Sequence, residues 1–355
     1  FNNTIFFQQR FGGISRYFTC LAKELINKNI DLKIIAPIYK NQYLKNIPKK
    51  NRLGIYISRY PQYKILELYS NLILKKVLNK EKPNIVHDTY YSKNIILPPG
   101  SKKILTIYDL IHEKFSDLYS EDFYNFKKKA ISNCDHFICI SNKTKSDFMN
   151  FYNIPESKIS VIYFGVEHML NLKKNIKLQN NKQKPFLLYV GSRLKYKNFK
   201  IIVDVFSKSK KLQNDFNVVC FGGGKFNNDE IKNFKNFNIK KNFMQINGSD
   251  NLLARLYLNA KALIFTSLYE GFGLPLIEAM SLGCPIISSN TSSMPEICDE
   301  AAEYFNPNDA DDLVNKLEDV LYKDGKLKEF IHKGLEKANQ FKWEKCANET
   351  LSLYR

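Results

Sequence analysis

Short apolar runs alternate with amphipathic segments along almost the whole chain. The first runs that predict strands lie at residues 4–7, 31–39, 84–91, 102–110, 136–141 and 158–166. A second series lies at residues 185–192, 216–224, 243–248, 260–267 and 285–290. Segments with helical periodicity lie at residues 14–29, 198–211, 229–236, 251–260 and 275–282. Strands spaced by helices are typical of βαβ units, so the pattern predicts an α/β protein with parallel sheets.

Residues 168–184 interrupt this alternation with a polar, lysine-rich stretch that ends before Pro185. Such a composition indicates a linker. We therefore expect two doubly wound, Rossmann-like halves at residues 1–167 and 183–330, followed by a further helix or two over residues 331–355. Folds of this kind bind ligands at the carboxyl ends of their strands, so the active site is expected in a cleft between the halves.

The composition supports a folded, globular protein. The chain has 355 residues, of which 44% are apolar and 25% charged, which argues against disorder. Its apolar runs fall far short of the ~18–20 residues that a membrane span needs, and its first residues do not have the pattern expected of a signal peptide. Because the chain opens without Met, almost inside a strand-like run, we expect the natural N-terminus to lie before Phe1. The seven cysteines form no CxxC pair, which favours reduced thiols in the cytoplasm.

The formal net charge of +19 indicates an anionic partner. Nucleic acid, an acidic membrane surface and a phosphorylated small molecule are the three candidates. Lysines are spread along the whole chain, whereas arginines number only seven. The individual arginines are therefore more informative than the lysines.

The most informative segment is residues 264–296. A predicted strand leads into the loop "YEGFG", and Pro275 stands where a helix should begin. Glu270 precedes the loop, and Glu278 is expected near the first turn of the helix, which Gly283 should end. The helix N-terminus suits a diphosphate, and glycines allow its close approach. The two carboxylates suit hydroxyls of a sugar and a ribose better than phosphate, although an ordinary turn with solvated glutamates is the alternative.

A second candidate is the loop "GSRLKYKNF" after the strand that ends at Gly191. Arg193 and Lys197 follow that strand end, where a fork of donors matches phosphate oxygens. A basic surface loop is the alternative.

Two glycine-rich turns are weaker candidates. Gly12 and Gly13 lie between a predicted strand and a helix, so their amides could face a phosphate or sugar, unless they only form a tight turn. The run "FGGGKF", with Gly222 and Gly223, leaves room for a nucleotide above a strand end. It matches neither a Walker loop nor a complete GxGxxG pattern.

Four polar residues follow strands of the first half. His87, Tyr108, Asp109 and Ser141 could all face the cleft. A structural histidine is the alternative for His87, and helix capping is the alternative for Asp109 and Ser141.

Two further segments have a structural explanation beside a functional one. The D-x-D within residues 308–312 is better explained as a helix cap than as a metal site. Residues 61–82 are amphipathic and basic, and could contact an anionic membrane or, more simply, pack on the sheet of the first half.

Five segments, in order, resemble the family 4 retaining glycosyltransferases of the GT-B fold. These are "RFGGISRYF", "ILTIYDLIHEKF", "ICISNKTKSDFMNFYNIPESKISVIYFGVE", "LLYVGSRLKYKNF" and "SLYEGFGLPLIEAMSLGCPIISSNTSSMPEI". The resemblance covers nearly the whole chain. Its most specific mark is the pair of Glu270 and Glu278 with seven residues between them, in the context "EGFGLPLIEA".

The resemblance implies roles for the matching residues. Glu270 would bind donor-sugar hydroxyls, Glu278 the ribose, and Arg193 and Lys197 the diphosphate. Backbone amides would complete the cradle and the base site, at Gly12, Gly13, Gly222, Gly223, Ile246, Leu252, Phe272, Gly273 and Leu274. His87 and Asp109 are further catalytic candidates, and Tyr108 and Ser141 are candidates for acceptor binding. The C-terminal helix would cross back onto the N-terminal domain.

The resemblance also implies the reaction. The enzyme would move a hexose, such as mannose, from a GDP- or UDP-sugar to a hydroxyl of a glycan or polyprenyl-diphosphate-linked acceptor. It would need neither a metal nor another cofactor. Bacterial O-antigen or capsule synthesis is the expected setting, in the cytoplasm or peripherally on the inner face of the cytoplasmic membrane, with no nucleic-acid partner.

Two departures from the family pattern stand out. Many relatives carry histidine where this chain has Tyr108, and the spacing from Arg193 to Lys197 is shorter than in many of them. A GT-B epimerase acting on nucleotide sugars and a basic nucleic-acid- or polyanion-binding protein are the alternative functions. The base, the sugar, the linkage and the oligomeric state stay open.

Overall fold

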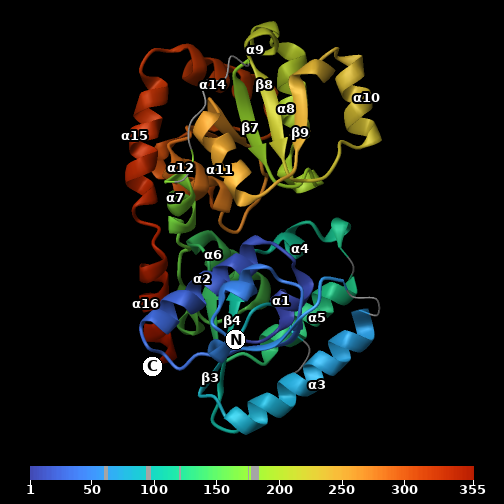
Figure 1. Ribbon diagram of the computed structural model, residues 1–355. Helices are drawn as coiled ribbons and strands as arrows, with labels where there is room; N and C mark the ends of the chain where they lie inside the picture. Colours follow the sequence, from blue (N-terminus) through green and yellow to red (C-terminus); the bar gives the residue numbers. More distant parts are fainter. Residues whose placement is uncertain (60–62, 93–96, 120, 175, 177–183) are drawn as a thin grey trace. The chain divides into compact units, whose positions relative to one another are not determined.

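The computed structural model describes residues 1–59, 63–92, 97–119, 121–174, 176 and 184–355. The chain divides into two compact units. Unit 1 comprises Phe1–Phe164 and Trp343–Arg355, and unit 2 comprises Gly165–Lys342. Each unit has its own parallel β-sheet with helices packed against it (Figure 1).

Unit 1 contains a four-stranded parallel sheet in the order β3-β4-β5-β6 and a separate parallel pair, β1 and β2. The strands are β1 Ile34–Tyr39, β2 Arg52–Tyr56, β3 Ile85–Asp88, β4 Lys102–Ile107, β5 His136–Cys139 and β6 Ile159–Val161. The helices are α1 Thr4–Gln8, α2 Gly13–Asn27, α3 Tyr63–Glu81, α4 Ile111–Lys114, α5 Glu121–Ser132, α6 Asn142–Tyr152 and α16 Trp343–Tyr354. The last of these, α16, packs against α2 within the same unit.

Unit 2 contains a six-stranded parallel sheet in the order β12-β11-β10-β7-β8-β9. The strands are β7 Phe186–Val190, β8 Asn217–Phe221, β9 Phe243–Ile246, β10 Ala262–Phe265, β11 Ile286–Ser289 and β12 Ala302–Phe305. The helices are α7 Glu167–Lys173, α8 Lys200–Lys208, α9 Lys210–Asp215, α10 Asn228–Asn236, α11 Asp250–Asn259, α12 Leu274–Leu282, α13 Met294–Cys298, α14 Ala310–Tyr322 and α15 Lys326–Ala338.

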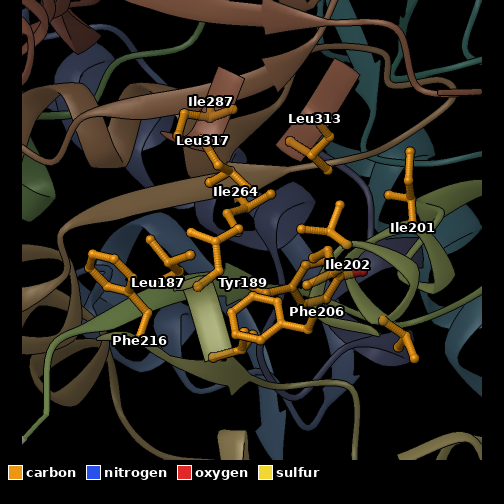
Figure 2. Close-up of a cluster of buried hydrophobic side chains, with 14 of the residues drawn as sticks. Leu187, Tyr189, Ile201, Ile202, Phe206, Phe216, Ile264, Ile287, Leu313 and Leu317 are labelled. Carbon is orange, nitrogen blue, oxygen red and sulfur yellow. The ribbon is translucent and has the colours of Figure 1, made fainter. Parts of the chain in front are cut away.

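The core of unit 2 explains why its strands read as continuous apolar runs. Both faces of a parallel sheet are covered by helices, so its central strands are buried on both sides. Leu187 of β7, Ile264 of β10 and Ile287 of β11 pack with Ile202 of α8 and Leu317 of α14 (Figure 2). Each is fully buried. Burying one such side chain stabilises the fold by ~1.5–3 kcal/mol, so this cluster holds the strand ends that carry the site.

Three predictions of local structure are wrong. Residues 4–7 form part of the helix α1 rather than a strand, because a short apolar run has no periodicity that separates the two. The segment at 198–211 is two helices, since the Ser209 side chain caps a new helix by accepting from the Leu212 amide. The predicted linker at 168–184 begins inside α7; residues 175 and 177–183 lie outside the described residues.

No described helix is both long enough and apolar enough to cross a membrane. All seven cysteines carry free thiols, and six of them are buried.

Candidate active site

The loop between β10 and α12 shapes the candidate site in unit 2. Gly273, directly before α12, has a φ of 96°, and a Cβ built there would lie 2.7 Å from Leu276 Cδ1. Glycine is therefore required at this turn. Pro275 occupies the first turn of α12, and Gly283 ends the helix with a φ of 73°, as the sequence predicts. The positive end of the α12 dipole consequently lies at the end of this loop.

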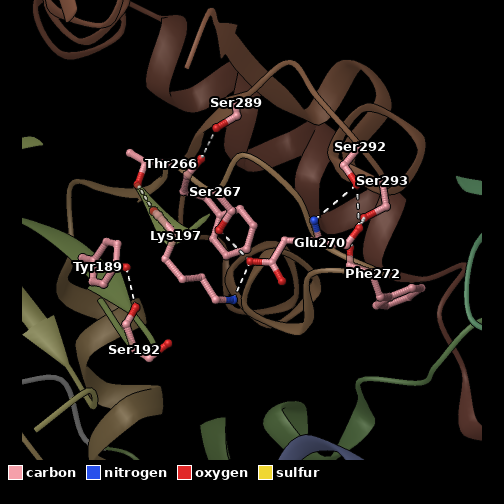
Figure 3. Close-up of polar contacts among 11 residues, drawn as sticks. Tyr189, Ser192, Lys197, Thr266, Ser267, Glu270, Phe272, Ser289, Ser292 and Ser293 are labelled. Carbon is pink, nitrogen blue, oxygen red and sulfur yellow. Dashed lines mark hydrogen bonds and ion pairs between the residues drawn. The ribbon is translucent and has the colours of Figure 1, made fainter. Parts of the chain in front are cut away.

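Glu270 lies at the centre of a buried polar cluster (Figure 3). Its Oε1 accepts hydrogen bonds from Lys197 Nζ and from Ser267 Oγ, each at 2.5 Å. Lys197 and Glu270 are thus an ion pair of which each side chain is largely shielded from water. Hydrogen bonds to charged groups are stronger than neutral ones, so this pair fixes the Glu270 carboxylate relative to the Lys197 ammonium group.

Two neighbouring segments hold the backbone of this cluster. Ser292 Oγ and Ser293 Oγ, which follow β11, donate to the Glu270 carbonyl at 2.7 and 3.0 Å. Thr266 Oγ1 donates to the Lys197 carbonyl at 2.8 Å, which ties the loop after β10 to the loop after β7 (Figure 3). The site is therefore built at the carboxyl ends of three adjacent strands, β7, β10 and β11.

Glu278 lies within α12 and contacts residues of α11 and α7. It is the fifth residue of this helix and so lies in the second turn, not the first. The side chain is buried, and its Oε2 accepts from Tyr257 Oη of α11 at 3.1 Å. His168 Nε2 of α7 lies 3.5 Å from Oε1. Sequence reasoning missed Tyr257 and His168, because it placed His168 in a linker and had no signal for a tyrosine on α11.

Arg193 has partners other than those predicted. Its Nε donates to Glu230 Oε1 at 2.7 Å, and its Nη2 donates to the carbonyls of Gly224 and Lys225 at 3.0 and 2.8 Å. The guanidinium also stacks near the Phe226 ring, 4.8 Å from its centroid. Arg193 therefore holds the glycine-rich turn after β8, and its predicted contact with the donor diphosphate stays a prediction.

Of the residues predicted to bind the base, Gly222 and Ile246 lie next to each other. The Gly222 amide donates to the Ile246 carbonyl at 2.9 Å, which joins the ends of β8 and β9. Gly222 and Gly223 both have positive φ, at 85° and 70°. Leu252 packs beside Gly248 in the next turn, where a Cβ would lie 2.5 Å from Leu252 Cδ2.

His87 in unit 1 has structural partners on both ring nitrogens, and its predicted catalytic role stays a prediction. Its side chain is buried, with Nδ1 at 2.6 Å from Tyr354 Oη and Nε2 at 2.8 Å from Thr106 Oγ1. Burial lowers its pKa to about 3, so the ring is neutral near pH 7.

Tyr108 and Ser141 are also occupied within unit 1. Burial raises the pKa of Tyr108, whose hydroxyl donates to the Thr89 carbonyl at 3.2 Å. Ser141 is buried and caps α6 by accepting from the Thr144 amide at 2.9 Å. Both hydroxyls therefore have partners within unit 1, and the prediction that they bind the acceptor stays a prediction.

Asp109 and the Gly12–Gly13 turn remain accessible in part. Asp109 Oδ1 accepts from the Ile111 amide at 3.0 Å, which starts α4. Gly13 begins α2 as predicted, but the preceding element is α1 and not a strand. The Gln9 side chain reaches over this turn, and its Oε1 accepts from the Ser15 amide at 3.3 Å.

No group of three or more His, Cys, Asp or Glu side chains in the described ranges is arranged to hold a metal ion. Asp309 of the D-x-D segment caps α14, since its side chain accepts from the amides of Asp311 and Asp312.

Two family models match the chain in succession. Residues 11–169 match the model for Glycosyltransferase Family 4, and residues 172–337 match the model for Glycosyl transferases group 1. The chain is 23% identical over 370 residues to the O-antigen chain mannosyltransferase B of Escherichia coli, covering 97% of this chain and 96% of the relative.

Solved structures agree in fold. The sucrose-phosphate synthase of Thermosynechococcus elongatus superposes with a TM-score of 0.73 at 19% identity, over 97% of this chain and 93% of that one. Anabaena Alr3699/HepE in complex with UDP and glucose superposes with a TM-score of 0.72 at 12% identity, over 96% and 95%. With its two parallel α/β units, the chain belongs to the family 4 glycosyltransferases of the GT-B fold.

Proposed function

We propose that this glycosyltransferase moves mannose or a related hexose, with retention, from a nucleotide diphosphate sugar to a hydroxyl of a growing bacterial surface glycan. The observation that carries this proposal is the cluster of Lys197, Ser267 and Glu270 beside the N-terminus of α12. The likeness to an O-antigen chain mannosyltransferase over nearly the whole chain supports the sugar and the setting.

The cluster suits a donor of this kind. Both side-chain hydrogen bonds that Glu270 makes with described residues fall on Oε1, so we assign Oε2 to hydroxyls of the donor sugar. Lys197 Nζ and the positive end of α12 stabilise the negative charge that develops on the departing diphosphate. Glu278, steadied by Tyr257 and His168, binds the ribose hydroxyls.

Arg193 has a positioning role in this proposal. Its hydrogen bonds to the carbonyls of Gly224 and Lys225 fix the conformation of the turn that lies over the nucleotide. The Gly222–Ile246 bond brings the neighbouring strand end to the base.

The proton of the acceptor hydroxyl passes to an oxygen of the departing diphosphate on the same face of the sugar. The new bond forms between the acceptor oxygen and the anomeric carbon as the bond to the phosphate oxygen breaks. The residues of the chain hold the two substrates in line and stabilise charge, and no step uses a side-chain nucleophile.

The remaining partners complete the proposal. Glycosyltransferases of this fold typically need no cofactor beyond the nucleotide sugar, and we extend this to the present enzyme with GDP or UDP as the carrier. Unit 1 binds a glycan or polyprenyl-diphosphate-linked acceptor. Asp109 keeps its proposed catalytic role, and the backbone of Gly12 and Gly13 keeps its proposed role toward the donor. The enzyme works in the cytoplasm, peripherally on the inner face of the cytoplasmic membrane.

Thermal unfolding with UDP, GDP, CDP and dTDP tests the donor site. A nucleotide at ~100 times its Kd stabilises the native state by ~2.7 kcal/mol, which raises Tm by several degrees. We expect a rise with GDP or UDP but not with all four. The matching nucleotide sugar should then lose its sugar to a glycan acceptor.

Two outcomes would contradict the proposal. If none of the four nucleotides raises Tm, the proposal of a donor site is wrong. Release of an epimerised or free sugar at the same rate with and without acceptor would favour an epimerase instead.

A further inference from the structure

The outward face of α3 in unit 1 exposes a row of large apolar side chains. Ile65, Leu68, Tyr69 and Leu72 are 62%, 64%, 56% and 55% exposed. Their spacing of i, i+3, i+4 and i+7 places them on one face of the helix. A contiguous exposed apolar patch on a folded protein marks an interaction site more often than a scattered surface leucine does.

The opposite face of α3 already has its partners. Ser70, Leu74 and Leu78 are buried, and the two leucines pack with Ile35 of β1 and Val86 of β3. At about 100° per residue, the buried and exposed rows lie about half a turn apart. The contacts that attach α3 to unit 1 therefore cannot also cover the apolar row, and Figure 1 shows the helix along the outside of this unit.

The charges on the helix follow the same division. The exposed row continues into the C-terminal half of α3 as Lys75, Lys76 and Lys80, all of which are exposed. The two carboxylates of the described α3 side chains, Glu67 and Glu81, fall on the inward side by the helical spacing, and Glu81 pairs with Lys33. The outward face is thus apolar at one end and basic at the other.

We propose that this face of α3, which we call the α3 face (Ile65, Leu68, Tyr69, Leu72, Lys75, Lys76 and Lys80), docks the protein on an anionic lipid bilayer. Apolar side chains of an interfacial helix enter the boundary between headgroups and acyl chains, while lysines remain among anionic headgroups. Each such lysine adds attraction to the negatively charged surface.

The charge decides between this occupant and a second copy of the chain. A symmetric dimer through the α3 face would bring two sets of lysines together in a protein that already carries a net charge of +19. An anionic bilayer instead neutralises them. The inference names the surface behind the membrane contact in the proposed function, and it is testable without any sugar transfer.

Co-sedimentation with vesicles tests the α3 face. The full chain is mixed with vesicles of phosphatidylcholine alone, or of phosphatidylcholine and phosphatidylglycerol at about three to one. We expect binding to the anionic vesicles at least tenfold stronger than to the neutral ones, and weaker binding as salt rises.

Two variants separate the apolar from the basic contribution. Leu68→Gln with Leu72→Gln should lower binding to anionic vesicles at least tenfold, and Leu335→Gln, an exposed leucine of α15, should leave it unchanged. Lys75→Gln with Lys76→Gln and Lys80→Gln should also lower it about tenfold. The matched control is Lys232→Gln with Lys235→Gln and Lys240→Gln, which removes the same charge from exposed lysines of unit 2.

Several results would overturn the inference. Equal losses in the two lysine triples would show a general charge effect rather than a surface on α3. Equal binding to both vesicle types would also reject it. So would a dimer in solution that becomes monomeric in the Leu68→Gln, Leu72→Gln variant. Circular dichroism and the nucleotide-induced Tm shift confirm that each variant is folded. If the unsubstituted protein itself shows no nucleotide-induced Tm shift, that result counts against the proposed donor site and not against the α3 face.

Discussion

Lys197 and Glu270 form an ion pair that is largely shielded from water, so replacing either residue should lower stability, by leaving the other charge unpaired, as well as catalysis. In the proposed mechanism, Lys197→Gln removes a charge that stabilises the departing diphosphate. Losing one such contact costs ~10²–10³-fold in turnover, so we expect kcat to fall about a hundredfold or more. Glu270→Gln should cause a loss of similar size.

Rates at saturating donor measure this effect. The control is Lys195→Gln, because Lys195 lies two residues away and is exposed. A loss in the control as large as that in Lys197→Gln would mean that charge in this loop matters generally, and not the ammonium group paired with Glu270.

His87 makes stability depend on pH. Its pKa is about 3 in the folded protein and about 6.5 when unfolded, so the unfolded chain binds the extra proton between these values. Stability attributable to His87 is therefore present above pH ~6.5 and is lost as pH falls toward 3, by up to ~1.4 kcal/mol per pH unit.

Urea unfolding of the wild type and of His87→Gln between pH 7 and pH 4.5 isolates this contribution, since the other titrating groups are common to both. We expect the wild type to lose stability more steeply than the variant as the pH falls. Parallel curves would show that His87 is protonated in the folded state.

The loop before α12 has no room for a side chain at Gly273. Gly273→Ala would place a methyl group in a left-handed conformation and against Leu276. Gly325→Ala is a matched control, because Gly325 has a similar φ of 84° and a methyl group added there would meet no atom within 4 Å. The control should cost ~1–2 kcal/mol from strain alone.

We expect Gly273→Ala to lower the free energy of unfolding further, and to abolish the nucleotide-induced Tm shift that Gly325→Ala retains. Urea unfolding and thermal scans with the bound nucleotide give both quantities. If the two substitutions change the free energy of unfolding and the Tm shift equally, the Leu276 side chain makes room for the methyl group and the loop does not move.

Elements differ in how far their sequence predicts them. The strand, loop and helix at 262–282 are predictable, because Pro275 and Gly283 mark helix ends through backbone geometry that depends on few neighbours. The run at 4–7 is not, since Ile5, Phe6 and Phe7 are all buried and apolar residues serve a buried helix and a buried strand equally well.

At the scale of the whole molecule, the alternation of strands and helices specifies two parallel α/β units, and both are present. The net charge of +19 indicates an anionic partner but does not indicate which surface of the protein binds it. The α3 face becomes visible only when Leu74 and Leu78 are seen to be the buried row, because the sequence alone assigns apolar residues to both sides of that helix.

By itself, the sequence determined the fold class, the Glu270 and Glu278 pair and the helix that begins beside them, because these depend on local backbone geometry and on residues close together in the chain. The tertiary structure decided which side chains are available. It joined Lys197 to Glu270 across 73 positions, turned Arg193 onto the glycine-rich turn and enclosed His87 between Thr106 and Tyr354. Hydrogen-bond partners and burial depend on contacts between distant segments, and composition and spacing do not contain that information.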